Sequence, residues 1–119
     1  MRSGFLSQAE NGVLIITLTE AKILDSTVIE RLHQQLIDLI GRSPESCVLL
    51  ECDRVDFMSS SALGMLIRIH KKCGQTKKSL RLCGLVPQLF QVFKITSLDR
   101  VFQISDDKAT ALASFPPRS

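Results

Sequence analysis

Residues 47–74, CVLLECDRVDFMSSSALGMLIRIHKKCG, decide how the rest of the chain is organised. The stretch opens with the continuous apolar run Val48–Leu50, which is typical of a strand buried on both faces of a parallel sheet. A polar break at Asp53 and Arg54 follows, and after three serines the apolar residues recur with the period of a helix. The sequence therefore predicts a buried strand, a turn and an amphipathic helix in succession.

The predicted helix has an apolar stripe and a polar stripe on opposite sides. At about 100° per residue, the apolar stripe contains Ala62, Leu66, Ile69 and Cys73, flanked by Leu63, Met65 and His70. The opposite stripe contains Ser60, Gly64, Arg68 and Lys71, with Ile67 at its edge. We therefore expect Ser60 to be exposed at the start of the helix, on the face turned away from the core.

The three serines fit two interpretations. One of Ser59, Ser60 and Ser61 is expected to cap the helix, because a serine oxygen accepts a hydrogen bond from an unpaired backbone N–H. One serine is enough for that, and a phosphate on another would add about −1.5 to −2 charges at pH 7. A helix N-terminus tolerates such a charge, and Arg68 or Lys71 could approach it. The serines are thus either a helix cap alone or a cap beside a phosphorylation switch.

Residues 55–64, VDFMSSSALG, resemble the signature of the STAS family, the anti-sigma-factor antagonists and their relatives. The resemblance extends to Leu24 and Asp25 and to residues 93–102, so it covers nearly the whole chain. It implies that the phosphorylated serine of the family corresponds to Ser60, with Ser59 and Ser61 as neighbouring candidates. Two positions depart from the commonest pattern: Ser59 stands where an Asp is usual, and Ala62 stands where a Gly is usual.

The resemblance implies a regulatory protein with no enzymatic activity, no cofactor and a cytoplasmic location. In its unphosphorylated form such a protein binds an anti-sigma factor that is itself a serine kinase, and phosphorylation ends the binding. A metal-dependent serine phosphatase then restores it. Taken with the polar stripe, the resemblance gives a candidate partner-binding set: Asp25, Ser59, Ser60, Ser61, Gly64, Ile67, Arg68 and Lys71.

Two alternatives are weighed against this hypothesis. Because Ser59 replaces the usual Asp, the chain could be a constitutive STAS module in a stress-signalling scaffold, a partner of a lipid or anion transporter, or a small-ligand binder. A serine hydrolase is disfavoured, because no G-x-S-x-G sequence is present and the candidate bases His33 and His70 both fall in helical patterns. Along a helix, His70 would lie roughly 15 Å from Ser60.

Composition indicates one globular domain over residues 1–119, with residues 115–119 as a C-terminal tail. The net charge is only +3, lysines cluster only in pairs, and Trp and Tyr are absent, so nucleic-acid binding is disfavoured. Five phenylalanines lie in apolar patterns and are expected in the core: Phe5, Phe57, Phe90, Phe93 and Phe102. No apolar run has the length of a membrane span, and no direct membrane insertion is expected.

The four cysteines, Cys47, Cys52, Cys73 and Cys83, form no C-x-x-C pair. Cys47 and Cys52 have opposite strand parity and should point to opposite faces of the sheet. We expect all four to be buried free thiols and expect no bound metal.

The remaining elements complete an α/β fold. Asn11-Gly12 predicts a hairpin between strands 5–9 and 13–18, and residues 19–24 are expected to be a loop. Asp25 or Ser26 should cap a helix ending at Gly41, with Thr27 and Glu30 at capping-box spacing.

After the central helix, a strand over 80–84 and a helix starting at Pro87 are expected, with Ile95, Leu98 and Val101 anchoring the next loop. A last strand over 102–104 precedes a helix that is capped by Ser105 or Asp106 and carries Ala109, Leu112 and Ala113. The result is a mixed, mostly parallel sheet of about four or five strands with about four helices, its N-terminal strand antiparallel.

Overall fold

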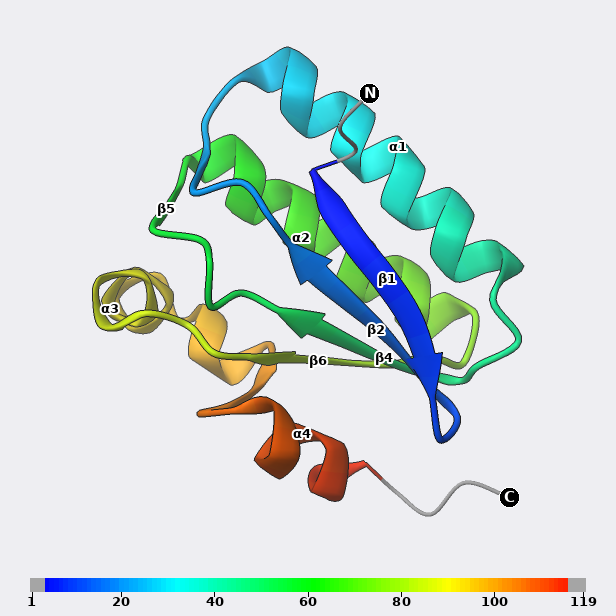
Figure 1. Cartoon of the computed structure of the whole chain (residues 1–119). Coiled ribbons are helices and arrows are strands. Elements are labelled where there is room, and N and C mark those ends of the chain that lie inside the picture. The colour runs from blue at the N-terminus through cyan, green and yellow to red at the C-terminus, as the bar shows by residue number, and fades with distance from the viewer. Residues whose placement is uncertain (1–3, 116–119) are drawn as a thin grey trace.

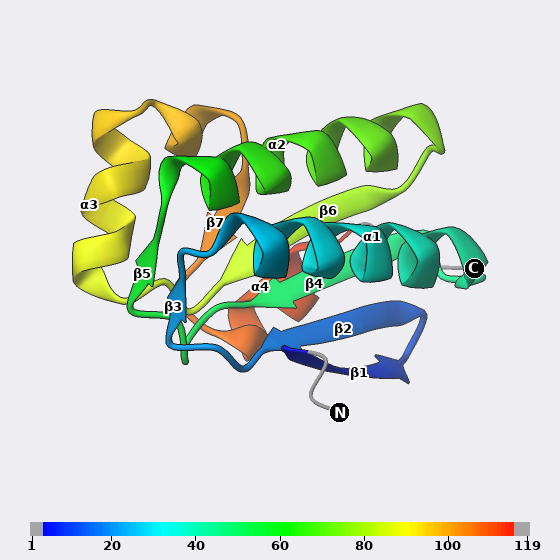
Figure 2. The ribbon, with the colours of Figure 1, turned by 90° about the horizontal axis from the view of Figure 1, so that it is seen from above.

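The computed structural model describes residues 4–115 and contains a five-stranded mixed sheet with helices on both faces (Figures 1 and 2). The spatial order of its strands is β1 (Phe5–Glu10), β2 (Val13–Leu18), β4 (Cys47–Glu51), β6 (Ser79–Cys83) and β7 (Gln103–Ser105). β1 is antiparallel to β2, and the other pairs are parallel. The predicted fold class is confirmed.

The hairpin between β1 and β2 turns at Asn11 and Gly12, as the sequence predicts. Both residues have positive φ angles, 52° and 82°, and their neighbours Glu10 and Val13 are paired across the turn. Two consecutive residues with positive φ are the requirement of the tight turn that matches strand twist, and Asn-Gly is the pair that adopts it most readily. β1 therefore forms an exposed edge of the sheet next to the buried β2.

Helices α1 (Ser26–Arg42) and α2 (Ser60–Gln75) lie side by side on one face of the sheet (Figures 1 and 2). The main core lies between them and the sheet, and every residue predicted on the apolar stripe of α2 contributes to it, with His70 half-buried at its border. α3 (Pro87–Ile95) and the short 3-10 helix η1 (Leu98–Arg100) follow β6. α4 (Lys108–Ser114) lies on the opposite face of the sheet.

A second, two-stranded sheet was not predicted. β3 (Lys22–Ile23) pairs in parallel with β5 (Phe57–Met58), so residues 22–23 are a strand inside the segment expected to be a loop. Ile23 and Met58 are buried partners, and Ser59 N–H donates to the Ile23 carbonyl at 3.0 Å. Two-residue strands are too short to show alternation in the sequence, which is why the pairing was missed.

One expected helix cap is confirmed and one is corrected. The N-cap of α1 is Asp25, one of the two expected residues, and its carboxylate accepts from Thr27 N–H at 2.8 Å. Thr27 lies inside α1, so the capping box starting at Thr27 is wrong. The N-cap of α4 is Asp107, which accepts from Thr110 N–H at 2.8 Å, in place of Ser105 or Asp106. Moving the cap also moves the buried face of α4: Ala111 is buried, whereas Ala109 and Ala113 are exposed.

Phe115 is part of the packed structure and does not belong to a tail. Only 6% of it is exposed, and it packs with α4 over the second face of the sheet, against Val13, Ile15, Cys47, Leu49, Cys83 and Ala111. The Arg81 guanidinium lies 4.9 Å from the centre of its ring. α4 is too short to cover these strands alone, and the aromatic ring completes the cover. Residues 116–119 of the expected tail lie outside the described residues.

Several residues expected in the core are exposed. Phe93 and Phe102 are buried and Phe5 packs against the core, but Phe57 is 48% exposed and Phe90 37%. In β5 only Met58 can face inward, because successive strand residues point to opposite sides. Of the three residues expected to anchor the loop after α3, Leu98 is buried, whereas Ile95 is 81% exposed and Val101 42%.

The division of α2 into two faces can be tested by stability. We expect Leu66→Ala or Ile69→Ala to lower the free energy of unfolding by about 2–5 kcal/mol, because both side chains are fully buried. Arg68→Ala should cost at most about 1 kcal/mol, since the ion pair it removes is exposed. Denaturant unfolding measures both effects, and a larger loss for Arg68→Ala would overturn the assignment of the faces.

Candidate functional site

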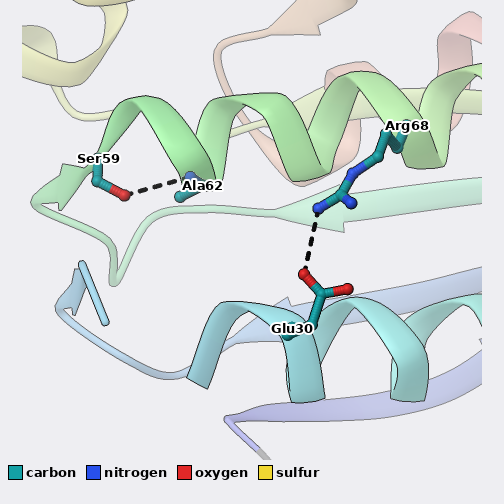
Figure 3. Close-up of polar contacts among 4 residues, drawn as sticks. All are labelled: Glu30, Ser59, Ala62 and Arg68. Atoms are coloured by element: carbon teal, nitrogen blue, oxygen red, sulfur yellow. Dashed lines mark hydrogen bonds and ion pairs between the residues drawn. The ribbon is translucent and has the colours of Figure 1, made fainter. Parts of the chain in front are cut away.

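The three serines have different positions at the start of α2. Ser59 is the N-cap: its side-chain oxygen accepts from Ala62 N–H at 3.2 Å (Figure 3). Its carbonyl accepts from Leu63 N–H at 3.0 Å. Ser60 and Ser61 are exposed, and the Ser60 hydroxyl makes no hydrogen bond with any residue in the range 4–115. The cap is therefore Ser59, and the Ser60 hydroxyl remains free in solvent, as the polar stripe predicts.

The β3–β5 pairing brings Asp25 to the same end of the molecule as Ser60. Ile23 and Met58 are paired, and α1 and α2 each begin within a few residues of them (Figures 1 and 2). Asp25 is exposed, but its carboxylate is already used to cap α1. The short sheet thus sets two helix N-termini side by side at one end of the α1–α2 layer.

Sequence analysis missed two apolar side chains next to these N-termini. Leu24, directly before Asp25, is 50% exposed, and Phe57, two residues before Ser59, is 48% exposed. Their inward-facing neighbours, Ile23 and Met58, are buried. In the sequence an apolar pair stands directly before each cap residue: Ile23-Leu24 before Asp25 and Phe57-Met58 before Ser59. This repeated pattern is the signal that could have revealed the two exposed side chains.

The other candidate residues on α2 line its outer side. Gly64 and Ile67 are half-buried, and Arg68 and Lys71 are exposed. A Cβ atom added to Gly64 would meet no atom within 4 Å. Packing inside the chain therefore does not require a glycine at this position.

Arg68 is directed toward α1 and away from Ser60. Its guanidinium lies 3.8 Å from the Glu30 carboxylate on α1 (Figure 3). Arg68 also follows Ser60 by two helical turns, roughly 12 Å along the axis, and Lys71 by roughly 16 Å. The expectation that these cations approach a phosphate on Ser60 is not supported by this geometry. Glu30, which the sequence analysis named only for its capping-box spacing, is the residue that pairs with Arg68.

The two histidines do not form a nucleophile–base pair with Ser60. His70 contacts Phe102 edge to face, with the ring centres 5.2 Å apart, and its Nδ1 is buried without a hydrogen-bond partner among the described residues. His33 lies on α1 beside Arg68; partial burial and then the Arg68 charge lower its pKa, against a smaller opposing effect of Glu30. Its imidazole is therefore neutral at pH 7.

All four cysteines are buried free thiols, as expected. Cys47 and Cys83 pack on the α4 side of the sheet and Cys52 and Cys73 on the α1–α2 side. Burial raises the pKa of Cys83 to about 12 and also raises the pKa values of Cys52 and Cys73, so these thiols stay protonated at neutral pH. Between residues 4 and 115 no three His, Cys, Asp or Glu side chains are placed to hold a metal ion.

None of the helices described here is both long enough and apolar enough to span a membrane.

Comparison with known proteins identifies the family. The model of the STAS domain matches residues 5–111. BtrV of Bordetella bronchiseptica, a protein assigned as an anti-sigma factor antagonist, is 29% identical to the chain over 105 residues, covering 88% of each protein.

Solved structures agree with this fold. A Thermotoga maritima protein assigned as an anti-sigma factor antagonist superposes over 92% of each chain with a TM-score of 0.80 and 21% identity. The Bacillus cell fate determinant SpoIIAA, in its phosphorylated form, superposes over 92% of this chain and 96% of its own, with a TM-score of 0.67 and 15% identity. The chain belongs to the STAS family, and the relatives that it matches at low identity include anti-sigma factor antagonists.

The different positions of Ser59 and Ser60 predict different effects on stability. Ser59→Ala should lower the free energy of unfolding by about 1 kcal/mol, because it removes the side-chain cap of α2. Ser60→Ala should change it by less than about 0.5 kcal/mol, because the exposed hydroxyl has no partner to lose. Thermal or denaturant unfolding of the two variants decides the assignment, and equal losses would contradict it.

Proposed function

We propose that this STAS domain is an anti-sigma factor antagonist that binds its partner with the surface around the start of α2 and loses that binding when Ser60 is phosphorylated. The partner is an anti-sigma factor that is also a serine kinase, and a metal-dependent serine phosphatase restores the binding. The chain acts as ligand and substrate, with no active site or cofactor of its own, and works in the cytoplasm.

The observation that carries the proposal is the division of roles between Ser59 and Ser60. Ser59 holds the cap of α2, so a modification of Ser60 leaves the hydrogen bonds that start the helix intact. Ser60 is exposed at the positive end of a 16-residue helix, where a dianion is tolerated electrostatically. Phosphorylation can therefore change the charge of the surface without unfolding it.

The proposed contact surface has an apolar part and a polar part. Leu24 and Phe57 supply exposed apolar area beside the caps. The sequence-selected residues lie at the caps and extend from there along α2: Asp25, Ser59, Ser60, Ser61, Gly64, Ile67, Arg68 and Lys71. Exposed apolar side chains next to a polar rim are the usual composition of a protein interface. The open space over Gly64 lets a partner approach the backbone of α2 closely.

A phosphate on Ser60 would oppose binding by being buried without a matching charge. The nearest cation of the candidate set, Arg68, is roughly two turns away and is paired with Glu30, so the chain supplies no side-chain partner for the dianion. Burying an unpaired charge costs several kcal/mol, and about 3 kcal/mol already lowers affinity a hundredfold. The existence of a phosphorylated form of SpoIIAA, which has this fold, supports a switch of this kind.

The replacement of the usual Asp by Ser59 fits this proposal structurally. Ser and Asp are similarly favoured as N-caps, and Ser59 caps α2 here. What the replacement removes is a carboxylate beside the acceptor, so the kinase has to recognise Ser60 from its exposure and from the surrounding surface.

The central prediction concerns Ser60 variants. Ser60→Asp should weaken binding to the cognate anti-sigma factor about a hundredfold, because it places a charge in the contact surface. Ser60→Ala should bind nearly as tightly as the wild type and should not be phosphorylated by the kinase. Titration calorimetry measures the affinities, and mass spectrometry after incubation with kinase and ATP maps the phosphate.

Ser61→Ala is the matched control, because Ser61 is the neighbouring exposed serine. The Ser61→Ala variant should still be phosphorylated by the kinase. Phosphate on Ser59 or Ser61 would move the switch by one residue. No phosphate on any of the three would contradict the switch and favour a constitutive STAS binding module, which the missing Asp kept open in the sequence.

A second prediction separates partner contact from folding. Gly64→Gln should leave the fold intact, or stabilise it by up to about 1 kcal/mol, because a helical glycine with open space over it is replaced by a better helix former. It should nevertheless weaken binding by blocking close approach of the partner. Gly74→Gln is the control, since Gly74 lies on the same helix with equally open space. Equal affinities of the two variants would exclude Gly64 from the interface.

A further inference from the structure

A groove between α1 and α2 carries an excess of positive charge. It is lined by His33 and Ile37 from α1 and by Arg68, Lys71, Lys72 and Gln75 from α2, and its volume is about 310 Å³. We call these six residues the basic groove. Three of them are cations at pH 7 and none is an acid.

The charge of the basic groove is only partly balanced by the chain itself. Glu30 pairs with Arg68 at 3.8 Å, and this is the one ion pair between side chains in the described range 4–115. Lys71 and Lys72 have no such partner there. Two adjacent lysines and an incompletely neutralised arginine on one wall of a groove favour an anionic occupant.

From this charge and shape we propose that the basic groove binds an acidic segment of a partner protein, whose carboxylates lie along α2 against Arg68, Lys71 and Lys72. The inference rests on the proposed function only in that it names a second contact of the same partner. Ile37 gives the groove an apolar wall against which the segment packs.

The geometry argues against a small phosphate ligand or a membrane surface as the occupant. The cations are spread over residues 68–72 in the second half of α2, where backbone N–H groups are used within the helix. No N-terminal backbone cradle for a phosphate is present in the groove. A flat anionic membrane would also meet Glu30 and Asp38, which are exposed on α1. An acidic segment needs no backbone cradle, because carboxylates spaced along it can face the side-chain cations of residues 68–72.

The basic groove acts independently of the proposed switch at Ser60. Lys71 lies roughly 16 Å along α2 from Ser60. This separation exceeds the Debye length of about 8 Å at physiological ionic strength, so a charge on Ser60 is largely screened from the lysines. Binding of an acidic segment should therefore not depend on the state of Ser60.

The test measures binding of the full chain to a fluorescein-labelled oligoglutamate peptide by anisotropy, with an oligoglutamine peptide of the same length as the reference. The double variant Lys71→Gln/Lys72→Gln should weaken oligoglutamate binding about tenfold at roughly 0.15 M ionic strength, the condition under which a charge on Ser60 is screened from the lysines. The control Lys77→Gln/Lys94→Gln removes the same charge from two exposed lysines outside the groove and should have little effect.

A gain of affinity gives a readout that misfolding cannot produce. Glu30→Gln releases Arg68 from its internal partner and should tighten oligoglutamate binding about threefold. Glu10→Gln makes the same charge change on the exposed strand β1 and should not tighten oligoglutamate binding. Ser60→Asp should bind the peptide as the wild type does.

Three results of the peptide and vesicle measurements would each overturn the inference. They are the absence of measurable oligoglutamate binding, equal losses in the two lysine double variants, and groove-dependent binding to equimolar phosphatidylcholine–phosphatidylglycerol vesicles without peptide binding. If the cognate anti-sigma factor binds the wild type and Lys71→Gln/Lys72→Gln equally well, the groove inference fails and the proposed function stands. If that factor does not bind the wild type, the proposed function fails, and the peptide comparison still decides the groove.

Discussion

The burial of β4 on both faces is the constraint on which the rest of the structure depends. Residues 47–50 are nearly inaccessible to solvent, so each face of the strand requires its own cover. On one face the cover is the α1–α2 layer, and on the other it is α4 completed by Phe115. Because β4 lies at the centre of the parallel pairs, its carboxyl end delivers the chain to the edge where loops are free to carry function. The turn after β4 leads to β5 and to the serines.

At that edge, the short β3–β5 sheet positions the candidate site. The pairing of β3 with β5 involves two residues on each side, yet it fixes the starts of α1 and α2 relative to each other. It buries Ile23 and Met58 and leaves Leu24 and Phe57 exposed beside the caps. The exposure of Phe57 beside the caps follows from this pairing, because successive residues of a strand point to opposite sides and Met58 points inward.

Sequence periodicity predicted the parts of this fold that repeat over many residues. The two faces of α2, the hairpin at Asn11-Gly12 and the alternation of strands and helices all depend on patterns long enough to be specific. The errors fall where the pattern is too short or where tertiary packing decides: the β3–β5 pair, the cap of α4, the exposure of Ile95 and the burial of Phe115. The candidate serine was identified from the sequence, but the Arg68–Glu30 pair was not. A contact between side chains of two different helices leaves no periodic pattern in the sequence of either helix.

The separation between the serines and the basic groove allows different parts of one surface to govern different steps of binding. Long-range attraction by unpaired surface cations mainly raises the rate of association, whereas buried apolar and polar contacts mainly set the rate of dissociation. On the proposed arrangement, Lys71 and Lys72 guide an acidic segment of the partner, and the end that carries Leu24, Phe57 and Ser60 holds the complex together. A phosphate on Ser60 would then shorten the life of the complex without abolishing the encounter. The partner would remain able to rebind as soon as the phosphate is removed, because the charges that attract it are screened from the switch.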